Sequence, residues 1–297
     1  MNPLVSVIIN CFNGEKYLSE TLNSVLAQTY ANWELIFWDN CSTDSTPNIV
    51  KGCNDSRIKY YRANVKTTLG QARNLAMEKA QGQLIAFIDA DDVWMPDYLR
   101  VCVNKIKENS AAVLVYVRFI NFDGGNEWLS PGGDLDKRIP INSLISSYGI
   151  GMSGALFSRS AKEDNNVYID ERFSLIEDFD FFIHLASCGE VYYISNPLMR
   201  YRWNASGLTQ NSKWATEYKM LYEKVKYEDN LKSYRNDIRK CYEFVQTRDL
   251  LLSGQRGKAL LFICKSVCRN PAILRYLFPV IFGMENFHKL RMMVSRM

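Results

Sequence analysis

The stretch LIAFIDADD (residues 84–92) runs from five apolar residues directly into three carboxylates. The apolar part has the length and composition of a short β-strand. Asp89, Asp91 and Asp92 fall within four positions, where their mutual repulsion costs stability unless a positive charge joins them. The stretch therefore predicts a strand that ends in a cation-binding site.

Strand and helix patterns alternate on both sides of this stretch. Strands are expected at residues 5–10, 34–38 and 58–61, and helices at 15–28, 70–80 and 96–108. Such alternation implies parallel strands joined by right-handed crossovers, hence an α/β fold with a doubly wound, mostly parallel sheet of the Rossmann-like kind. Because ligands of such sheets bind outside the carboxyl ends of the strands, residues 11–15, 39–44 and 89–92 are expected to line one site.

The pattern loosens after a further strand at residues 112–117. Residues 121–140 hold four glycines and two prolines and are expected to form a long loop over the site. A strand at residues 154–159 is expected to return to the sheet, and residues 212–294 are mostly helical by periodicity. The chain is thus expected to consist of a catalytic domain, residues 1–211, and a helical C-terminal region, residues 212–297.

The helical region is also the basic part of the chain. The whole chain carries a formal charge of +4, whereas its last 48 residues hold eight Lys or Arg against one acid. Basic residues mixed with apolar stripes are typical of helices that lie on a membrane surface. A helical cap with a basic outer face is the alternative interpretation, and no nucleic-acid recognition module accompanies the charge, so no nucleic-acid partner is expected.

The cysteines and histidines argue against two kinds of site, a disulfide framework and a zinc site. Eight cysteines without a CxxC motif or regular spacing indicate buried thiols rather than a disulfide framework, and two histidines argue against a His-rich zinc site. No signal peptide and no apolar run of membrane-spanning length is evident. We expect a cytoplasmic protein, with peripheral contact to the inner face of the plasma membrane if the basic helices are interfacial.

Other charged residues are positioned to complete the site. Asp39 and Asn40 end a neighbouring strand, Arg73 lies on the helix before the acidic strand, and Glu177-Asp178 opens an amphipathic helix. Two acids separated by one residue can face one cleft, and their hard oxygens suit Mg²⁺ or Mn²⁺ bridging substrate phosphates. The plain alternatives are that the acids cap helices or turns and that Arg73 is solvated, since short motifs match often by chance.

Three blocks taken together resemble a known family. They are the segments from VSVIINCFNGE to DNCSTDST, from GQARNLAMEKA to FIDADDVWMP, and from FSLIEDFDFFIHLA to LMRYR, spanning about residues 4–206. Their order and spacing resemble the family 2 inverting glycosyltransferases with a GT-A fold, of the type found in bacterial polysaccharide synthesis. The combination is specific for that family, whereas the DxD motif alone is not.

The resemblance implies a role for each matching residue. Asp178 would be the catalytic base, with Glu177 beside it, and Asp91 the metal ligand, with Asp89 contacting the metal or the ribose. The implied donor-binding residues are Cys11, Phe12, Asn13, Glu15, Asp39, Asn40, Arg73, Asp89 and Ala90. An inverting transfer needs one carboxylate to deprotonate the acceptor and a cation to neutralise the departing diphosphate, which agrees with these roles.

Two positions depart from the family pattern. Many members carry a histidine shortly after the YR of the third block, where this chain has Asn204, whose amide oxygen is a weaker metal ligand. The common DDGS after the second strand is DNCS here, so Cys41 replaces the usual glycine.

The expected function is a metal-dependent transfer of a hexosyl or N-acetylhexosaminyl group, with inversion, from a nucleotide-sugar, a UDP-sugar by preference. The acceptor would be a hydroxyl of a carbohydrate or lipid-linked saccharide in cell-surface polysaccharide synthesis. One alternative is a sugar nucleotidyltransferase, although CFNGEK lacks a Gly-rich phosphate loop. Another is a non-catalytic sugar-nucleotide-binding protein, against which the intact Glu177-Asp178 pair argues.

Overall fold

The computed structural model describes residues 2–203 and 214–276, and the chain divides into two compact units, Met1–Gly207 and Leu208–Met297. Asn204, a candidate metal ligand, lies outside the described residues. The assignment of a catalytic domain and a C-terminal region stays a prediction.

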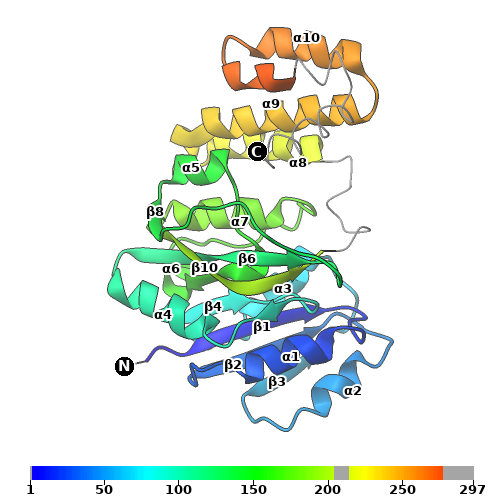
Figure 1. The fold of residues 1–297 in the computed structure, drawn as a ribbon, viewed down its shortest axis with the longest axis vertical. Helices are drawn as coiled ribbons and strands as arrows, with labels where there is room; N and C mark the ends of the chain where they lie inside the picture. The colour runs from blue at the N-terminus through cyan, green and yellow to red at the C-terminus, as the bar shows by residue number, and fades with distance from the viewer. Residues whose placement is uncertain (1, 204–213, 277–297) are drawn as a thin grey trace. The chain divides into compact units, whose positions relative to one another are not determined.

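One mixed sheet organises the first unit (Figure 1). In the order β3-β2-β1-β4-β9-β6-β10-β5, the neighbours β3, β2, β1 and β4 are parallel, β9 is antiparallel to both of its neighbours, and β6 and β10 are again parallel. The strands are β1 Val5–Cys11, β2 Trp33–Asp39, β3 Ile58–Arg62, β4 Leu84–Phe87, β5 Val93–Trp94, β6 Ala112–Phe122, β7 Glu127–Leu129, β8 Lys137–Ile139, β9 Ala155–Ser158 and β10 Glu190–Arg202. The mostly parallel α/β fold predicted from the alternation is confirmed.

The register of the parallel strands brings the predicted site segments to one edge. Cys11 at the end of β1 pairs with Asp39 at the end of β2, and Ile8 pairs with Phe87 at the end of β4. Both turns and the acidic stretch therefore leave the sheet on the same side, as expected for ligand binding at the carboxyl ends of strands.

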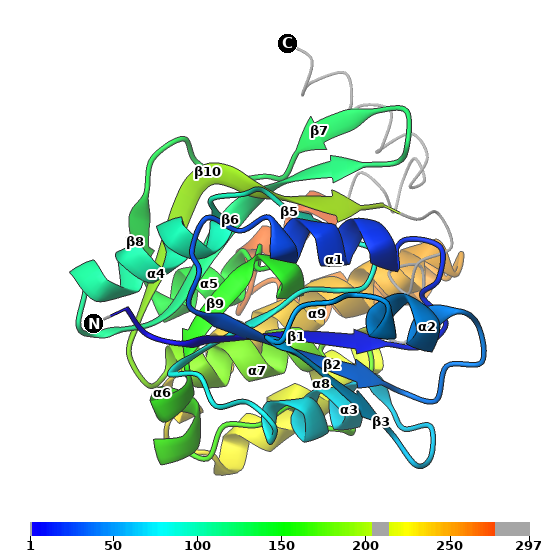
Figure 2. The ribbon, with the colours of Figure 1, turned by 90° about the horizontal axis from the view of Figure 1, so that it is seen from below.

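Helices cover both faces of this sheet, as the view from below shows (Figure 2). Apolar side chains of α1 (Leu18–Leu26), α2 (Thr46–Lys51) and α4 (Tyr98–Glu108) pack in the core on one face. The core on the other face contains apolar side chains of α3 (Leu69–Met77), α5 (Ile141–Ser146) and α7 (Glu177–Ala186). Helix α6 (Arg159–Asp164) directly follows β9 in the sequence. The two-sided burial explains why the central strands are almost wholly apolar.

The segment at residues 121–140 is not the structureless loop expected from its glycines and prolines. Strand β6 continues to Phe122 and folds back as β7, and β8 pairs with β10 further along. The Asp123 carboxylate accepts bonds from the backbone amides of Gly125 and Asn126 at 3.0 and 2.8 Å, and Gly124 has a φ of 90°. Asp123-Gly124 is a dipeptide typical of β-hairpin turns. The glycines of this segment therefore lie in the connections between strands.

The second unit is helical in its described part. Its helices are α8 (Trp214–Lys224), α9 (Arg235–Leu252) and α10 (Arg256–Ser266), and a small apolar core joins Leu251, Ala259, Ile263 and Ile273. Over the described residues, no helix combines the length and the apolar character needed to cross a membrane.

Candidate active site

The turn after β1 is bonded to the turn after β2 by three backbone amides. Asn13, whose φ of 56° lies in the left-handed region, turns these amides toward the second segment. The bonds are 3.0, 2.8 and 3.0 Å long and run from Asn13 to Ser42 Oγ, from Gly14 to Thr46 Oγ1 and from Glu15 to Asp44 Oδ2.

Bonds also run in the opposite direction. The amide of Thr43 donates to Asn13 Oδ1 at 2.8 Å, and the amide of Ser45 donates to Glu15 Oε2 at 2.9 Å. Asn13 and Glu15, two predicted donor-binding residues, therefore use their side chains to fix the second turn. The two turns form one rigid edge of the site.

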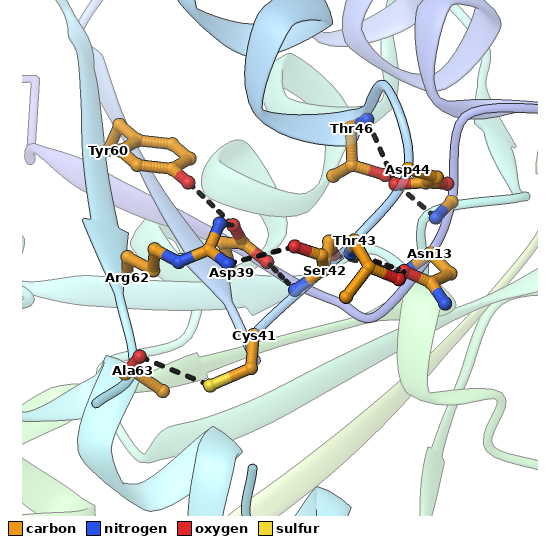
Figure 3. Close-up of polar contacts among 11 residues, drawn as sticks. Asn13, Asp39, Cys41, Ser42, Thr43, Asp44, Thr46, Tyr60, Arg62 and Ala63 are labelled. Carbon is orange, nitrogen blue, oxygen red and sulfur yellow. Dashed lines mark hydrogen bonds and ion pairs between the residues drawn. The ribbon is translucent and has the colours of Figure 1, made fainter. Parts of the chain in front are cut away.

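Asp39 is the fully buried centre of this edge (Figure 3). Its carboxylate accepts bonds from the Ser42 amide at 2.7 Å, the Tyr60 hydroxyl at 2.5 Å and Arg62 Nη1 at 2.8 Å. Because Asp39 is fully buried, its carboxylate positions the turn and Arg62 in this structure.

The other predicted donor-binding residues of these turns differ in accessibility. The ring of Phe12 is 42% exposed and has Lys66 Nζ 3.3 Å from its centroid, which leaves an aromatic face and a cation at the rim. Asn40 uses both ends of its amide on the backbone of Thr67, at 2.9 and 3.0 Å. Cys11 is buried, and that burial raises the pKa of its thiol to about 12. Phe12 and Lys66 are thus the groups here that are open to a ligand.

Arg73 connects the acidic stretch with the acidic pair of α7. Its Nη2 lies 3.1 Å from Asp89 Oδ1, and its Nη1 lies 3.1 Å from Glu177 Oε1. Arg73 and Glu177 are buried, whereas the Asp89 side chain remains 39% exposed. The positive charge nearest to Asp89 is therefore a guanidinium, and the exposed side of Asp89 remains available to a ligand or a cation.

Asp91 and Asp92 occupy different environments. Asp92 is almost fully buried, accepting bonds from Ser153 Oγ at 2.6 Å and the Arg202 amide at 2.9 Å, and burial raises its pKa well above the usual range. Burial, followed by the charge of Asp89, also raises the pKa of Asp91, which keeps part of its surface exposed. Asp92 is thus a structural acid, and the carbonyl of Asp91 is held by Arg202 Nε at 2.8 Å.

Asp178 opens helix α7 beside Glu177. Burial and then the charge of Glu177 raise the pKa of Asp178 to about 7, against the opposing effects of the Phe179 amide, Arg73 and Tyr148. The Tyr148 hydroxyl donates to Asp178 Oδ2 at 3.2 Å. A carboxylate with a pKa near 7 and part of its surface exposed can accept a proton efficiently at neutral pH.

Tyr201 on β10 is influenced by both acidic groups. Burial raises the pKa of its hydroxyl to about 12, and the charges of Asp92, Asp89, Asp91 and Asp178 act in the same direction. The charges at residues 89–92 and at the start of α7 therefore both act on Tyr201.

The donor atoms at the acidic stretch fit a hard divalent cation that a substrate helps to bind. Burial and the charge of Asp89 disfavour ionisation of Asp91, and a bound cation would relieve this cost. The described part of the chain has no group of three or more His, Cys, Asp or Glu side chains ready to hold an ion. Two carboxylates with substrate phosphates completing the shell are the usual arrangement for Mg²⁺.

Sequence reasoning passed over Tyr148, Tyr201 and Arg202 as site residues. Tyr201 and Arg202 stand in the third block, so a signal for them existed in the LMRYR segment. Tyr148 lies outside the blocks, and only the packing of α5 against α7 brings it to Asp178. The roles assigned to the individual site residues stay predictions.

Comparison with known proteins identifies the class of enzyme to which this geometry belongs. The model of glycosyl transferase family 2 matches residues 6–164, and the chain belongs to that family. The chain is therefore a glycosyltransferase, which removes the nucleotidyltransferase and the non-catalytic protein as alternatives.

Two relatives are Escherichia coli proteins, each named a UDP-Glc:α-D-GlcNAc-diphosphoundecaprenol β-1,3-glucosyltransferase. WfgD is 30% identical over 70% of this chain and 80% of its own length. WfaP is 42% identical over 63% of this chain and 71% of its own length. The Bacillus subtilis TuaG, a putative teichuronic acid biosynthesis glycosyltransferase, is 37% identical, but the match covers 52% of its length.

Solved structures share the fold. Staphylococcus aureus TarS (residues 1–349) in complex with UDP-GlcNAc superposes with a TM-score of 0.71 at 18% identity, over 93% of this chain and 81% of that one. The Pyrobaculum calidifontis mannosyltransferase PcManGT, in complex with GDP-Man and Mn²⁺, superposes with a TM-score of 0.63 at 16% identity, over 90% and 76%. The expected GT-A fold is confirmed.

Proposed function

We propose that this enzyme transfers a hexosyl group with inversion from a UDP-sugar to a hydroxyl of a saccharide carried on a lipid diphosphate, in the synthesis of a surface polysaccharide. In this transfer, the acceptor hydroxyl gives its proton to Asp178 while its oxygen bonds to the anomeric carbon. The bond between that carbon and the β-phosphate oxygen breaks, and UDP leaves with the electron pair.

The observation that carries the proposal is the joining of the two acidic groups by Arg73. One buried guanidinium contacts Asp89 on one side and, on the other, Glu177, the neighbour of the proposed proton acceptor Asp178. Preorganised charges of this kind act strongly because they need no rearrangement during the reaction.

Asp89 and Asp91 are the residues that would hold Mg²⁺ or Mn²⁺. Such an ion supplies neutralisation of the negative charge that develops on the departing diphosphate. The residues of the chain contribute the rest: Arg202 fixes the backbone of Asp91, and Ser153 links Asp92 to the Asp89 amide, to which it is bonded at 2.9 Å.

The choice of substrates rests on the relatives. WfgD and WfaP are named for UDP-Glc and for an α-D-GlcNAc-diphosphoundecaprenol acceptor. A TarS structure holds UDP-GlcNAc. A UDP-sugar and a diphosphate-linked saccharide are accordingly the substrates to test first.

The test is transfer by the purified protein with Mn²⁺, UDP-glucose or UDP-GlcNAc, and an α-GlcNAc diphosphate carrying an alkyl chain. We expect UDP release that depends on the acceptor, and a product whose new linkage is β when the donor is α, seen by NMR. A product with the donor's anomeric configuration would exclude inversion, and full activity after chelation with EDTA would exclude the metal.

We also propose that the C-terminal unit contacts the surface of an anionic membrane that carries such an acceptor. The charge and the exposed leucines of its described residues support this proposal. Residues 250–276 contain basic side chains and no acid. Leu260 and Leu261 on α10 are 43% and 56% exposed, close in sequence to Lys258 and Lys265. Exposed leucines next to cations are typical of helices that lie in a membrane interface.

A further inference from the structure

A cavity of about 710 Å³ lies within the first unit, and the donor-site residues do not line it. Its walls come from β6, β10, β8 with the segment before it, and α5 with the turn that follows it. Cavities that bind small molecules range from roughly 300 to 1,000 Å³, so this one is large enough for one or two sugar rings. The residues used below are Tyr116, Phe119, Lys137, Tyr148, Gly149 and Tyr193.

The cavity shares a side chain with the proton acceptor. Tyr148 lines the cavity, while its hydroxyl donates to Asp178 Oδ2 at 3.2 Å and its ring packs edge-on against Phe179 at 4.9 Å. A ligand that lies along Tyr148 is therefore led toward the carboxylate that must receive its proton.

Four aromatic side chains line the cavity: Tyr116, Phe119, Tyr148 and Tyr193. Tyr116 and Tyr193 pack at 5.3 Å, and Tyr193 donates to the Gly133 carbonyl at 3.0 Å, which holds the wall in place. Aromatic faces suit the C–H faces of a pyranose ring, and serine hydroxyls on and after α5 offer hydrogen bonds to its hydroxyls.

The charge of the cavity selects a neutral or anionic ligand. Lys137 is the charged residue among those described as lining it, and no ion pair joins Lys137 to another residue in the described part of the chain. The neighbouring acids are bound elsewhere: Asp134 pairs with Arg118 at 2.9 Å and Asp136 with Lys105 at 3.1 Å. A free cation in an acid-free wall favours a phosphate-bearing ligand.

We propose that this cavity binds the acceptor, a saccharide linked to a phosphate or diphosphate, with its sugar along Tyr148 and its phosphate at Lys137. The inference rests on the proposed function, because it gives the same reaction its second substrate. It assigns acceptor recognition to β6, α5 and β8 with the segment before it, apart from the turns that face the donor.

A cavity-filling variant separates this proposal from effects on the donor site. Gly149 lines the cavity, and a β-carbon on it would meet nothing within 4 Å, so the backbone has room for the start of the side chain in Gly149→Leu. We expect it to raise the KM for α-GlcNAc alkyl diphosphate by roughly tenfold or more, with the dissociation constant of UDP–Mn²⁺ by calorimetry within about twofold of wild type. Gly257→Leu on α10, which also has open space, is the matched control and should leave both values unchanged.

The charge is tested by Lys137→Gln against Lys162→Gln on α6. We expect the Lys137 variant to lose affinity for the diphosphate-linked probe and to keep its affinity for GlcNAc methyl glycoside, measured by saturation-transfer NMR with UDP present. Equal effects on the two ligands would overturn the phosphate assignment.

Binding is measured independently of turnover, so the two proposals fail in different ways. If the wild type binds the probe and Gly149→Leu binds it equally well, the cavity is not the acceptor site. If the wild type hydrolyses UDP-sugar but binds no probe, the acceptor inference is overturned while the donor reaction stands. If the wild type binds the probe but releases no UDP from any donor, the proposed function is wrong, whereas the assignment of the cavity as a binding site for a phosphate-linked saccharide stands.

Discussion

Arg73 Nη1 lies 3.1 Å from Glu177 Oε1, although 104 positions separate the two residues in the chain. The same guanidinium reaches Asp89 through Nη2. Asp89 follows strand β4, and Glu177 begins helix α7 after the antiparallel strand β9. Arg73 therefore joins the parts of the chain before and after β9.

Removing this cation should destabilise the fold. Arg73→Gln removes the guanidinium that pairs with the buried Glu177, and breaking a buried ion pair in this way costs roughly 3–5 kcal/mol. Thermal unfolding monitored by circular dichroism should show a clearly lower Tm. Arg100→Gln, which breaks an exposed pair with Asp97, is the control and should leave the Tm unchanged; equal stability of the two variants would contradict a bridging role for Arg73.

Replacing the proton acceptor should separate activity from stability. Asp178→Asn should lower the transfer rate by roughly 10²–10⁴-fold while UDP–Mn²⁺ binding by calorimetry is retained. Because the folded state raises the pKa of Asp178 to about 7, native protein binds a proton there that the unfolded chain has lost, so the wild type loses stability as pH rises from about 4 to 7.

The Asn variant lacks this ionisation, and its Tm should exceed that of wild type more at pH 8 than at pH 5. Asp164→Asn at the end of α6 serves as the control for both measurements. Substantial turnover by Asp178→Asn would remove Asp178 as the base.

The pH dependence of transfer should follow the same carboxylate. At saturating donor, kcat/KM is expected to rise with pH through a midpoint near 7, because only the deprotonated Asp178 accepts the proton. Tyr148→Phe removes a bond that favours the charged form, so the midpoint should move to higher pH. An unmoved midpoint would show that another group controls the profile.

The two halves of the sheet differed in how far the sequence could predict them. Strand β4 is a continuous apolar run and its neighbour β1 is a mostly apolar one, so both can be recognised in the sequence. The positions of their carboxyl ends predict the edge of the sheet on which the site lies. The hairpin of β6 and β7 was missed because glycine-rich composition describes a breaker and a hairpin turn equally well until pairing partners are known.

The site could be predicted only as a set of residue types. The position of Asp39 after a predicted strand indicates an acid that binds a nucleotide. Its bonds to Tyr60 and Arg62 could not be predicted, because they depend on the register of β2 and β3. The cavity beside Tyr148 depends on packing between α5 and the sheet, for which no local pattern exists.

Cys41 offers a test of backbone strain where glycine is usual. Its φ of 70° lies in the left-handed region, which costs an L-residue roughly 1–2 kcal/mol. Cys41→Gly should therefore be more stable than Cys41→Ala by about 1 kcal/mol in urea unfolding, since both lose the bond from Sγ to the Ala63 carbonyl. A more stable Ala variant would mean that the strain is absent in solution.

Membrane contact is tested with the whole protein and vesicles rich in phosphatidylglycerol. We expect flotation with the vesicles at low salt, weakening as salt rises, and loss of flotation in the double variant Leu260→Ser, Leu261→Ser. Leu135→Ser, which changes a leucine that is 78% exposed in the first unit, should float like wild type. Wild-type protein that stays in the bottom fraction would contradict the interfacial role of α10.

The reciprocal bonds between the turns at residues 11–15 and 42–46 have a consequence for how the enzyme meets its donor. Five bonds within the chain hold them together. Ordering such segments during association normally lowers affinity through lost conformational entropy. Here the edge is ordered by folding itself, so donor capture can proceed as a docking event onto a finished surface, and slow loop closure need not limit it.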